Sequence, residues 1–564
     1  MTSSPLILGP MLRYVDEHSA AVWCETQHAA TVEVTAGEQT WSVRTFAVHG
    51  HHYALVQLDN LPSGTIHHYR LHINGTQEWP EPTSTFPPSS ISTLQPGRPL
   101  TMSFGSCRTS VPHNAAGNAT HGIDALRATA IQLANDLTNT TTNKADASPR
   151  RPDLLLFLGD QVYADSTSAA MQEFIEQRRD ISEPPGDELA DFEEYAYLYR
   201  LAWSDPANRW LLSTVSTAMI FDDHDIRDDW NASLTWREQM EETSWWRGRI
   251  VAGLASYWLY QHLGNLAPTE RADDPIWRLI AEHTGPDEID VTEALDEFAD
   301  RCDRDPASYR WSFARDFGDT RLIVLDSRAA RELDPANRAV IDQTETRWLD
   351  EQMHGGFRHL LIGTSLPFLL PTGLHHLESW NEAISEGAWG ARAARWGEKL
   401  RQGLDLEHWA AFQKSFRALA RLAVQVADGK RGPAPETVTF LSGDVHYSYV
   451  SEVERTSGSR IIQAVCSPIR NPLPILVRSF TAVVSYGLSS TLTRRMARSA
   501  GVKGLPFRWK NIKGPWFDNC LGSLAVTDEG LKLWWTSGSI LNGDYDRPAA
   551  KRLVETTIRR RNSR

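Results

Sequence analysis

The chain has 564 residues, and 41% of them are hydrophobic, which is enough for two domains or for one domain with large insertions. It carries 57 lysines and arginines against 71 aspartates and glutamates, a formal net charge of −14. Such an acidic protein is a poor candidate for a nucleic-acid scaffold, because phosphate backbones attract a positive surface. The sequence contains no apolar stretch of roughly 18 residues or more, so we expect no membrane-spanning helix.

The cysteine pattern and the N-terminal segment restrict the class of protein further. The chain has five widely spaced cysteines: Cys24, Cys107, Cys302, Cys466 and Cys520. Their odd number and the lack of a Cys-x-x-Cys pair argue against a disulfide framework and against a structural zinc site. The segment Met1–Pro5 has no basic residue, no apolar stretch and no twin arginine, so we expect no secretion signal and a cytoplasmic location.

The first 95 residues have the pattern of a small all-β domain. Alternating or β-branched runs predict five strands: Ala21–Thr26, Thr31–Thr35, Trp41–Val48, Tyr53–Leu61 and Ile66–Ile73. The turn former Pro62-Ser63-Gly64 separates the last two runs, and Asn74-Gly75 ends the last one. Short strands at this spacing predict a β-sandwich over residues 1–95, which ends in a linker rich in proline, serine and threonine.

From residue 96 the pattern becomes that of an α/β catalytic domain, which we expect to extend to residue 564. Continuous apolar runs predict six buried strands: Leu100–Phe104, Leu154–Leu158, Thr217–Phe221, Leu322–Leu325, Leu360–Thr364 and Val438–Leu441. Strands buried on both faces lie between helices, and one helix is expected over Ile123–Leu137. Two tryptophan-rich stretches, about residues 230–305 and 375–430, have helical patterns and predict helical insertions.

Polar side chains follow four of these predicted strands. In open α/β sheets, ligands and catalytic groups collect at the carboxyl ends of the strands. After the first strand come Cys107 and Arg108, which alone would be interpreted as a buried cysteine and a surface arginine. Beside the other three clusters, Cys107 is a candidate thiolate ligand for a metal, and Arg108 is a candidate clamp for a phosphate group.

The second cluster begins with Gly159 and Asp160, directly after a predicted buried strand. A carboxylate at such a place is costly unless it is paired or bound to a metal, so Asp160 is a candidate bridge between two cations. Tyr163 follows three residues later, and in a turn its phenol points back toward Asp160. Asp165 is either an outer acceptor in this site or the N-cap of a following helix, which is the interpretation we favour slightly.

The third cluster runs from Asp222 to Asn231 and holds five carboxylates and one imidazole. Repulsion between the carboxylates is unfavourable without cations nearby. A solvated acidic loop is the alternative, but it fits badly with the apolar run that leads into it. Asp223 is the candidate metal ligand here, and His224 is the candidate general acid or donor to a phosphate oxygen.

The fourth cluster is Gly443-Asp444-Val445-His446, which follows the last predicted strand. Asp444 and His446 are two residues apart, and on an extended chain both side chains point to the same side. A carboxylate and an imidazole in this arrangement can hold one metal site.

Taken in this order, the four motifs resemble those of the PhoD-like (alkaline phosphatase D) branch of the calcineurin-like metallophosphoesterases. The resemblance covers about residues 100–450, and the N-terminal β-sandwich is similar to the small domain that precedes the catalytic domain in that branch. It implies an α/β/β/α-type layered core. It also implies a centre that holds Fe³⁺ and Ca²⁺, with another divalent metal as the alternative at the second position.

The resemblance assigns residues motif by motif. Cys107 stands where most calcineurin-like enzymes open with Asp-x-His, and Tyr163 takes the last position of Gly-Asp-x-x-Asp. Asp223 matches the ligand asparagine of Gly-Asn-His. Asp444 and His446 stand in place of the closing Gly-His-x-His. All five are therefore expected to be metal ligands.

One ligand that the family usually has is missing. A histidine normally ends an intervening strand, whereas this strand ends in Thr364 and Ser365. The resemblance offers Asn231 as the compensating ligand of the second metal. The donor types support the first metal independently, because thiolate and phenolate suit Fe³⁺ and do not suit magnesium or calcium, which prefer carboxylate and neutral oxygens.

The motifs predict a metal-dependent hydrolase of phosphate mono- or diesters, in which metal-activated water attacks the phosphorus of a small-molecule ester in line. The alternative hypothesis is a catalytically degenerate domain that acts as a binding or interaction protein, which the missing histidine suggests. Residues 477–502 offer a basic amphipathic helix for a membrane surface, although a helix packed on the catalytic domain is the favoured interpretation.

Overall fold

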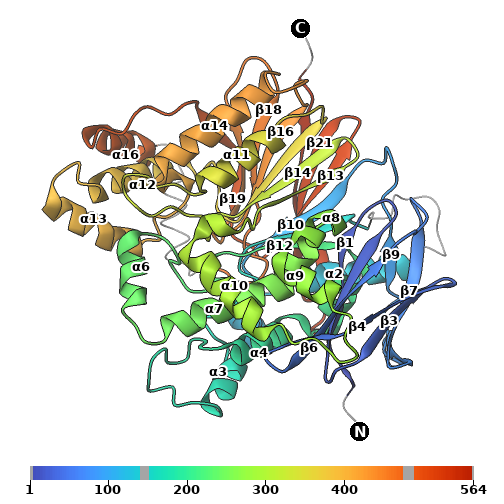
Figure 1. The fold of residues 1–564 in the computed structure, drawn as a ribbon. Helices are drawn as coiled ribbons and strands as arrows, with labels where there is room; N and C mark the ends of the chain where they lie inside the picture. Colours follow the sequence, from blue (N-terminus) through green and yellow to red (C-terminus); the bar gives the residue numbers. More distant parts are fainter. Residues whose placement is uncertain (1–3, 140–150, 474–487, 562–564) are drawn as a thin grey trace.

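The computed structural model describes residues 4–139, 151–473 and 488–561. Two antiparallel sheets form its N-terminal part (Figure 1). The first has the order β1 (Leu6–Val15), β2 (Ala20–Thr26), β6 (His51–Leu58) and β5 (Phe46–Val48). The second has the order β4 (Gln39–Arg44), β3 (Thr31–Ala36), β7 (Ile66–Ile73) and β8 (Thr76–Trp79), with β9 (Ser90–Ser92) paired to β7.

The alternation of buried and exposed residues explains the N-terminal sandwich. On β3, Val32 and Val34 are buried, while the residues between them are partly exposed. These valines share one core with Val22 and Val56 of the other sheet. The five predicted strands are present, and the run Trp41–Val48 is divided between β4 and β5.

Two larger sheets form the centre of the molecule (Figure 1). The six-stranded sheet has the order β12 (Thr217–Ile220), β11 (Leu154–Leu158), β10 (Thr101–Gly105), β20 (Leu521–Thr527), β21 (Gly530–Ser539) and β22 (Ala549–Arg559). The seven-stranded sheet has the order β13 (Phe313–Phe317), β14 (Thr320–Leu325), β15 (His359–Thr364), β16 (Thr437–Ser442), β18 (Arg460–Val465), β17 (Ser448–Val453) and β19 (Trp509–Trp516). All six strands that the apolar runs predict belong to these two sheets.

Side-chain alternation in the seven-stranded sheet shows how the layers are stacked. Leu322, Val324 and Leu361 belong to the core that includes strands β10 to β12. Their neighbours Ile323 and Ile362 belong to a second core, shared with α11 (Gln343–Gln352) and α14 (Gln413–Ala427). On the six-stranded sheet, α2 (Ala125–Asn139) contacts β21 and β22. The two sheets therefore lie between helical layers, and the predicted α/β/β/α core is confirmed.

The helices lie between the strands and in the two long stretches with helical patterns. The first stretch holds α6 (Leu234–Glu241), α7 (Trp246–Ser256), η2 (Tyr257–His262), η3 (Leu263–Asn265), α8 (Pro268–Asp273), α9 (Pro275–Glu282) and α10 (Thr292–Arg304). The second holds α12 (Thr372–Ser385), α13 (Ala391–Gly403), η5 (Trp409–Ala411) and α14. Other helices before residue 310 are α1 (Ala115–His121), α3 (Ala169–Glu176), α4 (Phe192–Trp203), α5 (Pro206–Thr214), η1 (Asp223–Asp225) and η4 (Pro306–Ser308).

The structure adds strands that the apolar runs did not predict, namely β1, β8, β9, β13 and β17 to β22. Several of them mix polar and apolar residues, as β19 and β22 do at sheet edges. Edge strands commonly carry polar and charged residues, which obscures the apolar signal. Residues 477–487 and most of the polar loop 139–152 lie outside the described part of the chain.

The C-terminal part of the predicted amphipathic helix is α16 (Leu488–Ser499), which contacts α12. Ala497 and Ala500 share a small buried cluster with Trp380 and Ile384. For these residues the structure agrees with the packed-helix interpretation. Within the described ranges, every helix is too short or too polar to cross a membrane.

The N-terminal sheets support the strand that leads into the third polar cluster. Strand β1 contacts β12, and the Thr217 hydroxyl donates to the Leu12 carbonyl at 3.1 Å. The fully buried Arg13 donates to the carbonyl of Tyr260 at 3.3 Å and so joins β1 to the π-helical turn η2. Tyr69 donates to the Ser213 carbonyl at 2.7 Å. These bonds fix the N-terminal sandwich against the layer that carries β12.

Candidate metal centre

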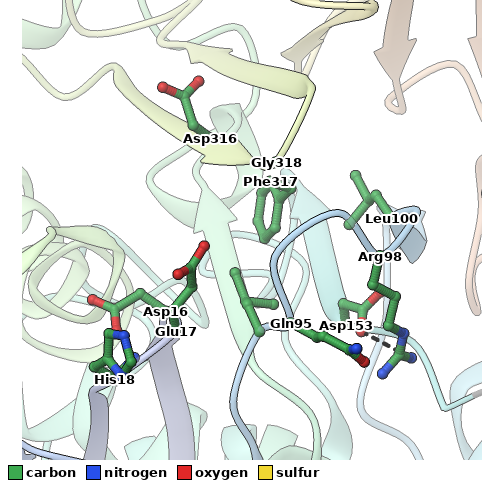
Figure 2. Close-up of a pocket in the computed structure, with 11 residues that line it drawn as sticks. Asp16, Glu17, His18, Gln95, Arg98, Leu100, Asp153, Asp316, Phe317 and Gly318 are labelled. Carbon is green, nitrogen blue, oxygen red and sulfur yellow. Dashed lines mark hydrogen bonds and ion pairs between the residues drawn. The ribbon is translucent and has the colours of Figure 1, made fainter. Parts of the chain in front are cut away.

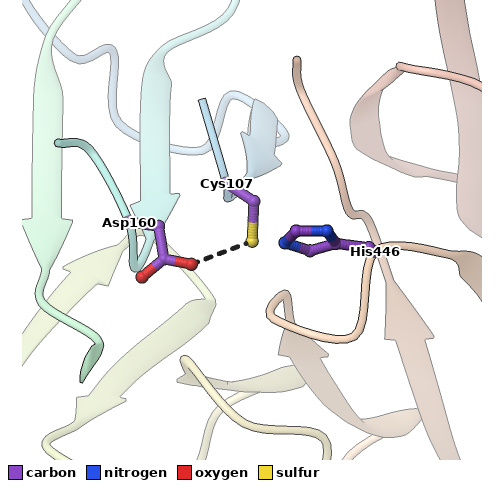
Figure 3. Close-up of side chains that lie close together, drawn as sticks. All are labelled: Cys107, Asp160 and His446. Carbon is purple, nitrogen blue, oxygen red and sulfur yellow. Dashed lines mark hydrogen bonds between the residues drawn. The ribbon is translucent and has the colours of Figure 1, made fainter. Parts of the chain in front are cut away.

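The carboxyl ends of β10, β11, β12 and β16 bring the four predicted clusters together. Candidate ligand atoms form three groups of three residues, and within each group the atoms lie within 4.8 Å of one another. The groups are Cys107–Asp160–His446, Asp160–Asp223–His224 and Asp222–Asp223–Asp444. Figure 3 shows the first group, with the thiol between the carboxylate and the imidazole. Because the groups share residues, they make one continuous cluster.

Tight turns of the backbone hold these side chains. Cys107, Asp160, Asp444 and His446 have positive φ angles of 57°, 48°, 65° and 54°. This left-handed conformation is uncommon outside glycine, and such residues concentrate at functional sites. Cys107, Asp160 and Asp444 each stand two residues after the end of a strand, and His446 lies in the same turn as Asp444. The strained turns therefore hold all four side chains at the strand ends.

Two glycines allow the turns to approach one another. A Cβ atom added to Gly159, whose φ is +100°, would lie 2.5 Å from Cβ of Asp222. One added to Gly443 would lie 2.1 Å from Oγ of Ser106. Real Cβ atoms essentially never come that close, so a larger residue at either position would push two of the clusters apart.

The Cys107 thiol is completely buried among oxygen atoms. Its Sγ atom lies 3.2 Å from Asp160 Oδ2 and 3.4 Å from the Asp444 carbonyl oxygen. The hydroxyls of Ser106 and Ser467 lie 3.1 and 3.2 Å from the same sulfur. Burial, and then the nearby carboxylates, raise the pKa of Cys107 well above its usual value. A thiolate at this place therefore requires a cation.

Tyr163 completes this side of the cluster. Its hydroxyl donates to Asp160 Oδ2 at 3.4 Å, as the three-residue spacing predicts. Burial and the neighbouring Cys107 raise the pKa of Tyr163 well above its usual value. Like the thiol, the phenol would ionise here only beside a strong positive charge.

The acidic side of the cluster contains an arginine that the sequence analysis missed. Arg328 is fully buried, forms an ion pair with Asp223 at 3.1 Å, and donates to Asp222 and Glu407. Burial nevertheless raises the pKa of Asp160 and Asp223 well above the usual value. The atoms Asp160 Oδ1 and Asp222 Oδ2 are buried without a hydrogen-bond partner. Orphaned carboxylate oxygens are costly, and a bound cation would satisfy them.

His224 is oriented by a carboxylate rather than left free. Its Nδ1 atom lies 2.9 Å from Asp165 Oδ1, and the other ring nitrogen, Nε2, lies 3.9 Å from Asp228 Oδ1. Burial lowers the pKa of His224, but Asp165 and Asp223 outweigh it and raise the pKa well above its usual value. The helix-cap interpretation of Asp165 is wrong, because the N-cap of α3 is Ser168.

Asp444 and His446 meet the cluster from the other sheet. Asp444 Oδ2 lies 2.7 Å from Nε2 of His408, a residue of the second helical insertion. Although burial acts in the opposite direction, the hydrogen bond and charge of His408 lower the pKa of Asp444 to about 2. Burial lowers the pKa of His446 to about 4, so its imidazole is neutral at physiological pH, the form that binds metals.

Arg108 does not reach the cluster, and the prediction that it clamps a phosphate is corrected. Its Nε and Nη2 atoms donate to Asp124 at 3.0 and 2.8 Å, and Nη1 donates to the Ala202 carbonyl at 2.7 Å. The guanidinium is buried, and its three hydrogen bonds go to Asp124 and the Ala202 carbonyl rather than to the predicted ligands. Only the backbone of Arg108 touches the site, through its N–H bond to the Asp160 carbonyl at 3.0 Å.

Asn231 is buried close to the third cluster, but its side chain serves another contact. Its Nδ2 atom donates to the Arg328 carbonyl at 3.2 Å. The backbone N–H of Asp229 donates to Asp223 Oδ2 at 3.2 Å, so Asp229 contacts a predicted ligand directly. The assignment of Asn231 as a ligand stays a prediction.

Of the site residues that were not predicted, Arg328 could have been recognised from the sequence, whereas His408 and Glu378 could not. Arg328 follows the predicted strand Leu322–Leu325 in the run Asp326-Ser327-Arg328, so the strand-end rule would have found it. His408 and Glu378 belong to the helical insertion, where no strand precedes them. Their role is visible only in the folded chain.

A separate cavity of about 370 Å³ lies between the N-terminal sheets, the linker and the β13–β14 turn (Figure 2). Asp16, His18, Arg98, Asp153 and Asp316 are among its lining residues, and Arg98 pairs with Asp153 at 3.3 Å. It shares no residue with the three metal-ligand groups, so it does not bear on their chemistry.

Comparison with known proteins adds two family matches. A family model described as PhoD-like phosphatase matches residues 138–474, and one described as a domain of unknown function, DUF7800, matches residues 3–91. No curated protein sequence matches the chain. A solved structure titled "Structure of PhoD" aligns with a TM-score of 0.57 at 13% identity, covering 99% of this chain and 91% of that one. A type III pullulan hydrolase from Thermococcus kodakarensis aligns with a TM-score of only 0.14 at 9% identity, covering 63% of this chain and 54% of that one.

Proposed function

Because this chain belongs to the PhoD-like phosphatase family, we propose that its strand-end cluster is the metal centre of a hydrolase that acts on phosphate mono- or diesters. The observation that carries the proposal is the group Cys107–Asp160–His446, in which a thiol, a carboxylate and an imidazole lie within 4.8 Å of one another. Cys107 and Asp160 are buried, and His446 is partly buried. Such a group is unfavourable without a cation, and with one it becomes a mixed sulfur, oxygen and nitrogen ligand set.

The donors fit two metals of different character. The first would be held by Cys107, Asp160, Tyr163 and His446. The second would be held by Asp160, Asp223, Asn231 and Asp444. Fe³⁺ suits the first set because it accepts thiolate and phenolate, and Ca²⁺ suits the second because its donors are carboxylate and amide oxygens. When bound, such metals withdraw charge from phosphate oxygens and lower the pKa of water, which in-line hydrolysis requires.

His224 is proposed as the general acid. Asp165 accepts a hydrogen bond from Nδ1 at 2.9 Å and so fixes the ring, and in the protonated imidazolium Nε2 carries the proton that can be donated. The ring also packs against Tyr163, with centroids 4.8 Å apart. Held in this way, Nε2 would give its proton to the oxygen of the leaving alcohol, a contribution of about 100- to 10,000-fold in rate for a well-placed acid.

The experiment that tests the proposal measures metal content and hydrolysis on one preparation. We expect iron and a second divalent metal in the purified protein, and hydrolysis of both nitrophenyl phosphate and bis(nitrophenyl) phosphate. Chelation should abolish both activities, and added metal should restore them. An Asp160→Asn variant should lose metal and activity together. A protein without metal and without turnover on either ester would refute the proposal and favour a degenerate binding protein.

A further inference from the structure

At the end of β15, where the family usually has a histidine, this chain has hydroxyl groups that bond to one another. Ser365 follows β15, and its Oγ atom lies 2.7 Å from Oγ of Ser327. The Ser365 carbonyl accepts a bond from the Gly443 N–H at 2.9 Å. This position therefore supports the loop that carries Asp444, but it brings no imidazole to the second metal position.

An imidazole reaches the same region from the helical insertion instead. His408 lies between α13 and η5, and its Nε2 atom is 2.7 Å from Asp444 Oδ2. Its other nitrogen, Nδ1, is 2.7 Å from Glu378 Oε1 on α12. Since carboxylates only accept hydrogen bonds, both ring nitrogens donate, and the imidazole links the two carboxylates in one row.

The Glu378 carboxylate makes few polar contacts apart from the one with His408. Its side chain is 3% exposed, and within the described part of the chain its only hydrogen bond is the one to His408. Its second oxygen, Oε2, is buried without a partner. A buried carboxylate with one unpaired oxygen is unfavourable for folding. Such costs are typical of functional residues, and the role that fits Glu378 is to orient the His408 ring.

We propose that the Glu378–His408 pair is a positioning device that fixes Asp444 as a ligand of the second metal. His408 binds Oδ2 of Asp444, so Oδ1 is the oxygen that would be left for a metal beside Asp222 and Asp223. Asp444 stands on a turn with φ of 65°, and among the described residues His408 is the hydrogen-bond partner that holds its carboxylate. The inference rests on the proposed function, because it assumes that Asp444 is one of the residues that hold the second metal.

The geometry favours a positioning role over direct ligation by His408. Its nitrogen atoms are not among the atoms that lie within 4.8 Å of one another in the group of Asp222, Asp223 and Asp444. Both nitrogens are also already occupied by carboxylates. Outer hydrogen bonds of this kind typically change metal affinity by about 10- to 100-fold.

The test is a Ca²⁺ titration of the iron-loaded full-length protein by calorimetry. We expect His408→Ala to raise the Kd for Ca²⁺ by about 10- to 100-fold, with unchanged iron content and unchanged visible absorption. Glu378→Gln should weaken Ca²⁺ binding in the same direction. His408→Gln keeps an N–H donor for Asp444 and should recover most of the affinity. His376→Ala is the matched control, since this histidine of the same insertion lies near Arg494 and Arg498 instead.

Each other outcome overturns the proposal in a recognisable way. An unchanged Kd in both His408→Ala and Glu378→Gln would show that the pair does not act on the metal. A His408→Gln variant as weak as His408→Ala would make His408 a ligand itself. Loss of iron together with Ca²⁺ would indicate a general collapse of the site. If the wild-type protein binds iron but no second ion, the role proposed for Glu378 and His408 is refuted and the proposed function stands. If it binds neither metal, the proposed function is refuted.

Discussion

The Cys107 sulfur lies 3.2 Å from Oδ2 of Asp160, although 53 positions separate the two residues in the chain. The parallel strands β10 and β11 pair side by side, so the residues that follow them emerge at the same sheet edge. Both side chains are buried, and burial raises the pKa of each well above its usual value. A cation beside two such acids would stabilise the ionised form of both, and paired acids with raised pKa values are therefore typical of metal sites.

Replacement of Cys107 by serine should therefore remove the first metal, for which Cys107 is a proposed ligand. Serine keeps the size of the side chain but does not ionise at neutral pH. We expect iron content to fall, the visible absorption to bleach or shift, and activity to drop by more than about 100-fold, beyond the effect of an outer hydrogen bond. Elemental analysis and absorption spectra measure the first two effects.

The control for this variant is Cys302→Ser. Cys302 is also a buried thiol, but it lies on α10 and belongs to none of the metal-ligand groups. Its replacement should leave iron and the spectrum unchanged. An unaltered spectrum in Cys107→Ser would exclude a sulfur ligand and would weaken the case for Tyr163 as well.

Much of the site could be predicted because it follows one rule. Cys107, Asp160, Asp223 and Asp444 each stand directly after a buried apolar strand or within three residues of one, and the parallel arrangement of the strands brings their ends together. The rule gives positions but not the direction of long side chains. Arg108 follows the same strand one residue after Cys107, yet its guanidinium binds Asp124, a partner that no local sequence pattern indicates.

The parts that could not be predicted depend on contacts between distant segments. His408 is 36 positions from Asp444 and 30 from Glu378, and a helical pattern surrounds it. In the fold, β19 and β22 carry the polar residues of edge strands, so they lack the continuous apolar runs of β11 or β16. The sequence pattern therefore predicts strands that are buried along their whole length. It does not predict strands in which buried and exposed residues are mixed.

Replacement of Asp165 by asparagine tests the assignment of His224 as general acid. The amide can still accept from Nδ1, but it removes the charge that stabilises the protonated ring. We expect kcat to fall by about 10- to 100-fold while metal content stays constant, within the range that acid catalysis contributes. The loss should be larger for an alkyl ester than for a nitrophenyl ester, because a poor leaving group needs the proton more. An equal loss on both esters would contradict the role.

Replacement of Arg328 by methionine tests the electrostatics of the acidic side. The guanidinium is fully buried between Asp222, Asp223 and Glu407, and its removal leaves Asp222 and Asp223 without their cation, while Glu407 keeps its ion pair with Arg331. Breaking a buried ion pair from one side costs about 3–5 kcal/mol. Urea unfolding of the metal-free protein should show a loss of that order, because a bound metal would add its own stabilisation.

An exposed ion pair gives the contrast for that measurement. Arg321 pairs with Asp316 at 2.8 Å, and the carboxylate side chain is 58% exposed. Arg321→Met should cost no more than about 1 kcal/mol, as is usual for surface pairs. A similar small loss in Arg328→Met would show that the buried carboxylates protonate instead of remaining charged.

Acid sensitivity of the fold can be tested at His262, far from the proposed ligands in sequence and enclosed by aromatic rings. His262 is fully buried, its Nε2 atom lies 2.9 Å from the Tyr309 hydroxyl, and Nδ1 has no hydrogen-bond partner. Burial, helped by Arg310 and Arg13, lowers the pKa of His262 from 6.5 to about 3. The unfolded chain therefore binds a proton between these values while the folded chain does not.

The sign follows directly from this difference in proton binding. The contribution of His262 to stability is fully present above about pH 6.5 and is lost as pH falls toward 3, by up to about 1.4 kcal/mol per pH unit. In His262→Gln this loss is absent, so the unfolding free energies of wild type and variant should converge between pH 6.5 and 5. Urea unfolding at fixed metal concentration measures it, and the exposed His28→Gln is the control. Parallel pH profiles for wild type and His262→Gln would mean that the ring accepts a proton in the folded state, which would require an acceptor for Nδ1 in this aromatic pocket.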